Sequence, residues 1–386
     1  MRFISSSQIF SGKEFLIPNS VLVLDEKEVV CDILNQQEVD EQLIEHFDGI
    51  ITPGFINTHC HLELSHLKGV IPKHTGIVDF GLHVIKHRND ASIEFQLEMM
   101  READKEMKSQ GIVAVGDISN NTNSIIIKQQ SSLHYHTFIE LIGLNPDKAD
   151  VIFNVGKQLL TEFKSIGISA SLAPHAPYSA SLPLIEKIFL DCNSHHLPTT
   201  IHNQESEAEN EFFASKTGDY IRLYDTLGIS LNYFKPTCVS SLQTIASAFN
   251  PTVRTLLVHN TFSKKEDIQL IQNNHPNLFW CLCPNANLYI ENTLPNFNLL
   301  NLNMCEFTLG TDSLASNLQL SIIDEINQVL NCQPDFELEI LLKAATYNGA
   351  KFLGIESNYG QIRKGKNSGI NLIEGKKGSF TVKKLA

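Results

Sequence analysis

The chain alternates between short apolar runs rich in β-branched and aromatic residues and longer amphipathic stretches. The apolar runs predict strands at 112–118, 135–142, 168–174, 199–202, 255–259, 278–283 and 304–310, after an earlier run that begins at Gly49 and is broken by Pro53-Gly54. Helical periodicity is clearest at 92–109, 151–165, 184–191 and 264–272. Repeated strand–helix alternation predicts an α/β protein with parallel strands, here a (β/α)8 TIM-like barrel with its active site at the strands' carboxyl ends. An open doubly wound sheet is the alternative, but no glycine-rich phosphate loop follows an early strand.

The two ends of the chain show a different sequence pattern, with short predicted strands and turns. Short strands separated by turn residues are predicted at 8–12, 20–24 and 28–34, and again at 367–374 and 378–382. Neither group is large enough to bury a core alone. We therefore expect a small β-sandwich built from both chain ends, residues 1–50 and 352–386, attached to a barrel of residues 51–351.

Composition narrows the function classes. With 43 acidic and 30 basic residues the net charge is −13, which argues against nucleic acid and anionic membranes as partners and favours a small-molecule substrate. No signal-peptide core and no membrane-length apolar run are found, so a cytoplasmic location is predicted. The eight cysteines show no CxxC pairing and are expected to be free thiols. The oligomeric state is left open, with a homodimer as one option.

Two histidines, His59 and His61, lie two positions apart in the run that follows Gly49. In an extended strand this spacing puts both imidazoles on the same side, which is half of a metal site. The remaining ligands are expected at later strand ends, where His175, His202, His259 and Asp312 stand. Each one alone is more simply a structural histidine or, for Asp312, a helix cap. Together they favour a metal centre.

Several strings resemble the amidohydrolase superfamily, in its deaminase and chlorohydrolase branch. They are residues 53–61, 202–205, 258–260, 283–288 and 310–313, with a similar tail at 344–350 and 360–366. The resemblance implies a barrel whose chain ends form a β-sandwich, and one divalent metal in the mouth, zinc first and iron or manganese as alternatives. Two departures are the long segment 206–250 and Ser368-Gly369, where the family usually has Ala-Asp.

The resemblance also implies roles. His59, His61, His202 and Asp312 are the metal ligands, and the metal lowers the pKa of its bound water from 15.7 to about 7 so that hydroxide can attack. Asp312 accepts the proton of that water, His259 polarises the nucleophile, and Glu205 shuttles a proton to the substrate. Its neighbours Glu207, Glu209 and Glu211 are expected to be helix N-terminal acids only. One metal is expected, because the fourth strand ends in 173–175 without the bridging lysine of two-metal relatives.

The string 59–67 resembles enzymes that deaminate 6-amino-6-deoxyfutalosine, an adenine nucleoside bearing a benzoate, and more loosely adenosine and S-adenosylhomocysteine deaminases. A guanine deaminase of this branch would be expected to have an arginine within residues 175–178, and this chain has none there, which weakens that assignment. Glu63, His175 and Arg88 are the candidate substrate contacts, each with a structural alternative: a solvated first-turn acid, a turn hydrogen bond and a basic helix end. A chlorotriazine hydrolase, an imidazolonepropionase or other cyclic-amide hydrolase, and a non-enzymatic metal-binding scaffold are the competing functions.

Overall fold

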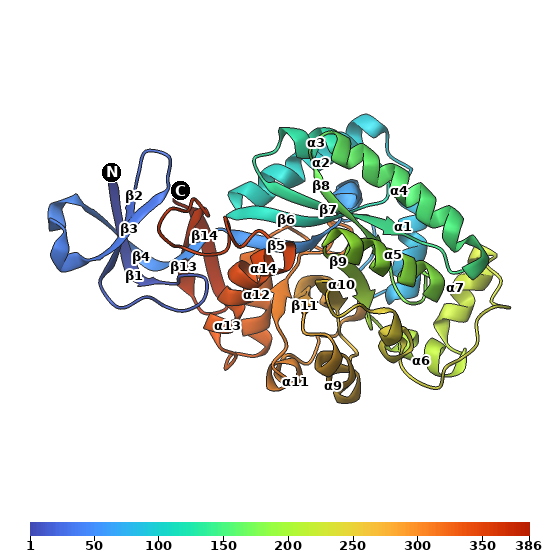
Figure 1. Ribbon diagram of the computed structural model, residues 1–386. Coiled ribbons are helices and arrows are strands. Elements are labelled where there is room, and N and C mark those ends of the chain that lie inside the picture. Colours follow the sequence, from blue (N-terminus) through green and yellow to red (C-terminus); the bar gives the residue numbers. More distant parts are fainter.

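A small sheet formed by both chain ends sits beside a larger body of parallel strands and helices (Figure 1). The computed structural model describes residues 1–386. The small sheet has six strands in the order β14-β13-β4-β1-β2-β3. Their bounds are β1 Arg2–Ile9, β2 Ser20–Leu24, β3 Val30–Asn35, β4 Ile44–Pro53, β13 Ile370–Lys376 and β14 Ser379–Lys384. Strand β13 pairs antiparallel with β4, so the two chain ends are joined within one sheet.

The larger body contains two four-stranded parallel sheets, ordered β5-β6-β7-β8 and β12-β11-β10-β9. Their bounds are β5 Phe55–Cys60, β6 Ile112–Ser119, β7 His134–Leu141, β8 Ser169–Pro174, β9 Thr199–Asn203, β10 Thr255–His259, β11 Leu278–Leu282 and β12 Phe307–Leu309. The sheets meet at both edges. A parallel bridge joins Cys60 to Asp312, and the His202 N–H donates to the His175 carbonyl at 2.9 Å.

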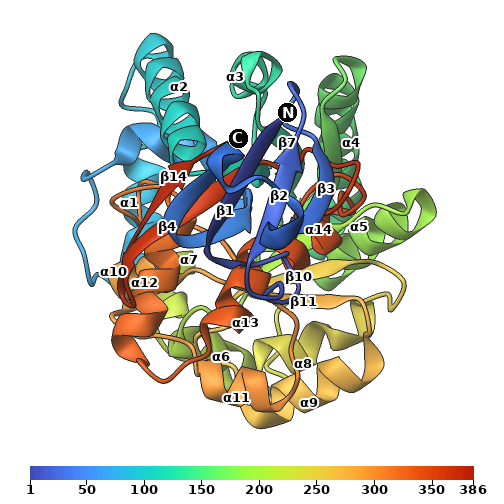
Figure 2. The same ribbon diagram turned by 90° about the vertical axis from the view of Figure 1, so that its left-hand side faces the viewer.

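Helices surround the parallel strands, and the small sheet lies in front of them when the molecule is viewed from that end (Figure 2). Their bounds are α1 Ile77–His87, α2 Ile93–Ser109, α3 Ile125–Gln130, α4 Ala149–Ser165, α5 Leu182–His195, α6 Glu207–Ser215, α7 Asp219–Leu227, α8 Ser241–Ile245, α9 Lys265–Asn274, α10 Pro284–Glu291, α11 Phe297–Leu302, α12 Ile322–Cys332, α13 Leu338–Lys343 and α14 Gly349–Leu353. None of the helices combines the length and apolar character needed to cross a membrane.

A shared core joins the two parallel sheets. Ile56 of β5, Phe138 of β7, Val258 of β10 and Phe279 of β11 belong to one buried cluster, which Phe352 of α14 also enters. Because residues of a strand point alternately to its two faces, the same strands also contribute to the larger cluster packed under the helices. Strands buried on both faces explain why the sequence shows continuous apolar runs there rather than strict alternation.

The Pro53-Gly54 break links the small sheet to the parallel strands. Pro53 ends β4 and Phe55 begins β5, so the chain passes directly from one part to the other. A side chain at Gly54 would place a Cβ 2.3 Å from Val113 Cγ1 and 2.8 Å from the Ser368 carbonyl oxygen. Glycine is therefore required here by close packing, not by an unusual backbone angle.

Most predicted strands lie where the structure has them, and three details are corrected. The run after Gly49 is two strands, β4 and β5, not one. The first strand covers Arg2–Ile9 rather than 8–12, and the last parallel strand is shorter than 304–310 because its first residue, Met304, is an exposed turn residue with φ 55°. The long segment 206–250 folds into α6, α7 and α8.

Candidate active site

Three histidines converge at the carboxyl ends of the parallel strands. His59 and His61 lie on and just after β5, and their Nε2 atoms are 3.1 Å apart. His202 of β9 brings its Nε2 to 3.3 Å from that of His61. His59 is fully buried, whereas His61 keeps 12% of its side chain exposed. The i, i+2 spacing thus places the imidazoles of His59 and His61, at the end of β5, on one side, as the sequence predicted.

Asp312 completes this set after β12. Its Oδ1 lies 3.5 Å from His59 Nε2 and 3.4 Å from His61 Nε2. The backbone turns sharply here, with φ 56° at Asp312, and Ser316 Oγ donates to the other carboxylate oxygen at 2.5 Å. Burial opposes ionisation of Asp312, but the hydrogen bond with His59 and the nearby His61 and His259 hold its pKa below the usual range.

These four residues fit a divalent metal. Ligand atoms at about 2.0–2.1 Å from a tetrahedral ion are separated by roughly 3.3 Å, close to the distances observed here. The Nε2 atom of His61 lies 3.1 Å from that of His59 and 3.3 Å from that of His202, which is the spacing expected of nitrogen ligands around one ion. Burial lowers the pKa of His202 well below its usual value, which keeps the ring neutral as a metal ligand must be.

The backbone carbonyl of His175 sets the orientation of the His202 ring. Both its backbone N–H, at 2.9 Å, and its Nδ1, at 2.8 Å, approach the carbonyl oxygen of His175. A carbonyl oxygen only accepts, so Nδ1 carries the proton and the Nε2 lone pair points into the site. His175 therefore supports the metal ligand through its main chain, while its own side chain lines the pocket.

Glu205 and His259 form a buried pair beside the ligands. His259 Nε2 lies 3.5 Å from Glu205 Oε1, and their side chains are 1% and 5% exposed. Burial raises the pKa of Glu205 well above that of a free carboxyl group and lowers the pKa of His259 to about 3. A carboxyl group whose pKa is raised in this way is suited to general acid–base chemistry.

One neighbour of Glu205 differs from the prediction. Glu207 and Glu211 are exposed, but Glu209 is fully buried. Its Oε1 accepts the Gln204 N–H at 3.1 Å and its Oε2 accepts the Glu205 N–H at 3.2 Å. Glu209 is therefore not a solvated helix acid. It holds the backbone from which Glu205 projects, a contact that sequence spacing alone does not reveal.

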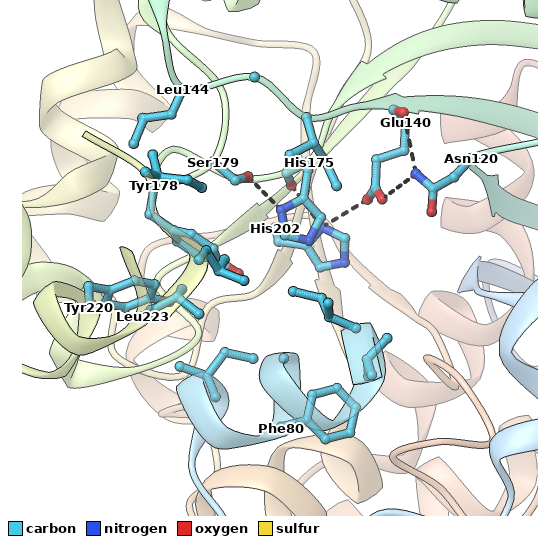
Figure 3. A pocket seen from close by; sticks show the side chains of 18 of the residues that line it. Phe80, Asn120, Glu140, Leu144, His175, Tyr178, Ser179, His202, Tyr220 and Leu223 are labelled. Atoms are coloured by element: carbon cyan, nitrogen blue, oxygen red, sulfur yellow. Dashed lines mark hydrogen bonds and ion pairs between the residues drawn. The ribbon is translucent and has the colours of Figure 1, made fainter. Parts of the chain in front are cut away.

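Three of the four candidate metal ligands, His61, His202 and Asp312, line a cavity of about 490 Å³. Its walls are mostly apolar or aromatic and come from α1, α7 and the segments after β7 and β8, including Phe80, Leu144, Tyr178, Tyr220 and Leu223 (Figure 3). Helices α1 and α7 are joined at the surface by an ion pair between Asp79 and Arg222 at 2.7 Å. The segment 206–250 thus builds one wall of the pocket.

The predicted substrate residues are not all at the pocket surface. His175 and Arg88 line it, Arg88 from the carboxyl end of α1. Glu63 does not: its Oε2 accepts hydrogen bonds from the backbone N–H of Asn120 at 3.1 Å and the side chain of Asn121 at 3.0 Å. Its contacts place it one layer behind the pocket.

Sequence reasoning missed Glu140, which lies at the end of β7 and lines the pocket. Its Oε2 accepts a hydrogen bond from Asn120 Nδ2 at 2.9 Å, and its Oε1 lies 3.7 Å from His202 Nδ1. A signal was present, because Glu140 is an acidic residue within an apolar predicted strand, near the end where catalytic groups gather.

Comparisons with known proteins agree with this geometry. The model of the amidohydrolase family matches residues 50–385. The chain is 25% identical to the aminodeoxyfutalosine deaminase of a Nitratiruptor species, over 100% of this chain and 94% of that protein. The crystal structure of Helicobacter pylori aminofutalosine deaminase in complex with methylthio-coformycin shares the fold, with a TM-score of 0.81, 23% identity, and coverage of 97% and 93% of the two chains. An adenosine deaminase from Xanthomonas campestris with bound zinc aligns with a TM-score of 0.72 and 20% identity, over 96% and 84%.

Proposed function

Because the chain belongs to the amidohydrolase family, we propose that it is a metal-dependent deaminase that removes the exocyclic amine of an adenine-type nucleoside. The observation that carries this proposal is that the buried Glu205–His259 pair lies beside the proposed ligands and lines the same cavity of about 490 Å³. A non-enzymatic metal-binding protein would need neither member of the pair. The deaminases among the relatives support the same reaction.

His59, His61, His202 and Asp312 would hold one divalent ion, for which we propose zinc, with iron and manganese as alternatives. The zinc in the Xanthomonas campestris structure supports this choice. When bound, such an ion lowers the pKa of a coordinated water from 15.7 to about 7 and so supplies the nucleophile.

Side chains of the protein accept and donate the protons of the reaction. Asp312 accepts a proton from the attacking water, and His259 orients that water from the side facing Glu205. Glu205 protonates N1 of the adenine ring as C6 is attacked. As the C–N bond breaks, Asp312 passes the proton that it took from water to the departing amine, and Glu205 takes up the hydroxyl proton left on C6. Ammonia and an inosine-type product result, which consumes one water and needs no further cofactor.

The outer part of the cavity supports a nucleoside with a large acidic substituent. Its walls are apolar, yet Arg88 and Lys148 line it and neither forms an ion pair with a carboxylate of the protein. An unpaired guanidinium in a protein of net charge −13 is a suitable partner for a substrate carboxylate. We therefore propose 6-amino-6-deoxyfutalosine or another adenosine derivative as the substrate.

We also propose that the two parallel sheets close into one (β/α)8 barrel. The contacts at both sheet edges and the shared core support closure. A buried cluster with residues from β1, β2, β3, β4 and β13 supports a curled, sandwich-like small unit. The divisions at 50/51 and 351/352 stay predictions, although β4 runs past the first to Pro53 and α14 spans the second. A cytoplasmic location also stays a prediction.

The proposed function is tested with a substrate panel. Zinc-loaded protein is incubated with 6-amino-6-deoxyfutalosine, adenosine, S-adenosylhomocysteine, guanine, cytosine and a chlorotriazine, and ammonia and chloride are measured. We expect ammonia from the adenine nucleosides, fastest from the one with the acidic substituent, because remote contacts stabilise the transition state. Ammonia from guanine or cytosine alone, or chloride without ammonia, would contradict the nucleoside assignment.

A further inference from the structure

The pocket contains a buried carboxylate that the proposed chemistry does not use. The side chain of Glu140 is only 4% exposed and lines the cavity. Asn120 Nδ2 donates to its Oε2 at 2.9 Å, but its Oε1 has no hydrogen-bond partner in the protein. The nearest nitrogen, His202 Nδ1 at 3.7 Å, donates instead to the His175 carbonyl. A buried acceptor without a donor is unfavourable, and because Glu140 borders the cavity, a bound ligand that slightly displaces its neighbours can supply the missing donor.

His175 provides a second polar group at the same place. Its Nδ1 is bonded to Ser179 Oγ at 2.5 Å, which leaves Nε2 available. Ligating atoms of Glu140, His175 and His202 lie within 4.8 Å of one another. His202 is already engaged through both ring nitrogens, so only Glu140 and His175 remain, too few to hold a second metal. Figure 3 shows the Glu140 carboxylate between Asn120 and His202, with His175 nearby.

We propose that Glu140 is a specificity-determining residue that, together with His175, binds the vicinal ribose hydroxyls of the substrate. This inference rests on the proposed nucleoside deaminase function. A cis-diol offers two neighbouring O–H donors, which a carboxylate oxygen accepts strongly and an imidazole nitrogen can also accept. The pair stands beside the metal ligand His202, so a nucleoside with its base at the metal would place its sugar within the same cavity.

One carboxylate oxygen of Glu140 is held in place by Asn120. Asn120 contacts both Glu140 and Glu63, because its side chain donates to the former and its backbone N–H donates to the latter at 3.1 Å. A binding group whose second oxygen is fixed loses little freedom when substrate arrives. Glu63 then acts as a positioning residue, because it holds Asn120, which in turn holds Glu140. This is a different role from the substrate contact that the sequence predicted for Glu63.

The test compares Glu140→Gln and Glu140→Ala with wild-type protein, all loaded with zinc, on adenosine and 2′,3′-dideoxyadenosine. Loss of a hydrogen bond to a charged group corresponds to roughly 10- to 100-fold in kcat/KM. We expect both variants to lose about this factor on adenosine, mainly in KM, and to change less than about threefold on the dideoxy compound. Asn120→Ala should show the same selectivity with a smaller loss, and Glu102→Gln, an exposed residue paired only with Lys105, should show none.

Two further measurements separate the explanations. Metal content is measured in every variant, and calorimetric binding of both nucleosides is measured alongside turnover. An equal loss on both substrates, or loss of metal in Glu140→Gln, would overturn the hydroxyl-binding role and indicate support of His202 instead. Retention of full discrimination by both Glu140 variants would also overturn it. A wild-type protein that neither binds nor deaminates any nucleoside would overturn the proposed function, and the present inference with it.

Discussion

Glu209, which is buried and accepts hydrogen bonds from the backbone of Gln204 and Glu205, leads to a prediction for the substitution Glu209→Gln. In the wild-type protein the two carboxylate oxygens of Glu209 accept the N–H groups of Gln204 and Glu205 at 3.1 and 3.2 Å. Glutamine has the same shape but keeps only one acceptor oxygen, so its amide N–H₂ must face one of these backbone donors. The backbone of Gln204 already has a left-handed φ of 45°, a conformation that needs support from its surroundings.

The magnitude follows from these contacts. A hydrogen bond to a charged group contributes about 1.5–3 kcal/mol, so the substitution should lower the free energy of unfolding by about 2 kcal/mol. Misplacement of a catalytic group by about 1 Å can reduce the rate by 10²-fold. We therefore expect kcat to fall by roughly 10- to 100-fold while KM and metal content change little, because the hydrogen bonds of Glu209 go to residues 204–206 and to none of the proposed metal ligands.

The assay is steady-state ammonia release at a temperature well below both unfolding midpoints, with elemental analysis of the same samples. Glu207→Gln is the matched control, since Glu207 is an exposed acid on the same helix, 3.7 Å from Lys264, and should change kcat less than twofold. A Glu209→Gln variant with near-normal kcat, or one whose lost activity is fully explained by lost metal, would refute the positioning argument.

The remaining predictions concern the ligands, the proton carrier and acid stability. Purified wild-type protein should contain about one divalent metal per chain and the His59→Ala, His61→Ala double variant almost none by elemental analysis; two tightly held metals would contradict the single site. Glu205→Gln should keep its metal but lose about 10²- to 10⁴-fold in kcat, and near-normal turnover would require another proton carrier. Burial lowers the pKa of His136, which lies between the hydroxyls of Ser169 and Ser171, from 6.5 to about 3. The unfolded chain therefore binds more protons below pH 6.5, and denaturant unfolding should show about 2 kcal/mol less stability at pH 5 than at pH 7 from this residue, a slope that His136→Gln should flatten.

The ligand set was within reach of the sequence because it depends on local geometry. His59 and His61 need only an extended backbone to share a face, and β5 provides it. His202 and Asp312 follow runs whose composition marks them as strands, and parallel strands that alternate with helices bring their carboxyl ends together. Periodicity, turn residues and strand-end chemistry predicted these elements and the polar residues at their ends, and the resemblance to the amidohydrolase superfamily separated the four proposed ligands from His175 and His259.

Other features required the folded chain. The Pro53-Gly54 break reads as a turn, but only pairing of β4 with β1 and β13 shows that one apolar run belongs to two different sheets. Glu209 has the same local sequence context as its exposed neighbours, and only its burial against the Gln204-Glu205 backbone separates it from them.

The pocket beyond the metal ligands was decided by tertiary structure alone. One wall comes from α7, within a segment that the sequence marked only as long, and the adjoining wall comes from α1, more than a hundred residues away. Glu140 faces the cavity and Glu63 stands behind it because Asn120 lies between them. Local patterns determine which residues form strands and where metal ligands can stand, since these depend on backbone period and side-chain type. Which carboxylate meets the substrate depends on packing between distant elements, and that information exists only in the folded protein.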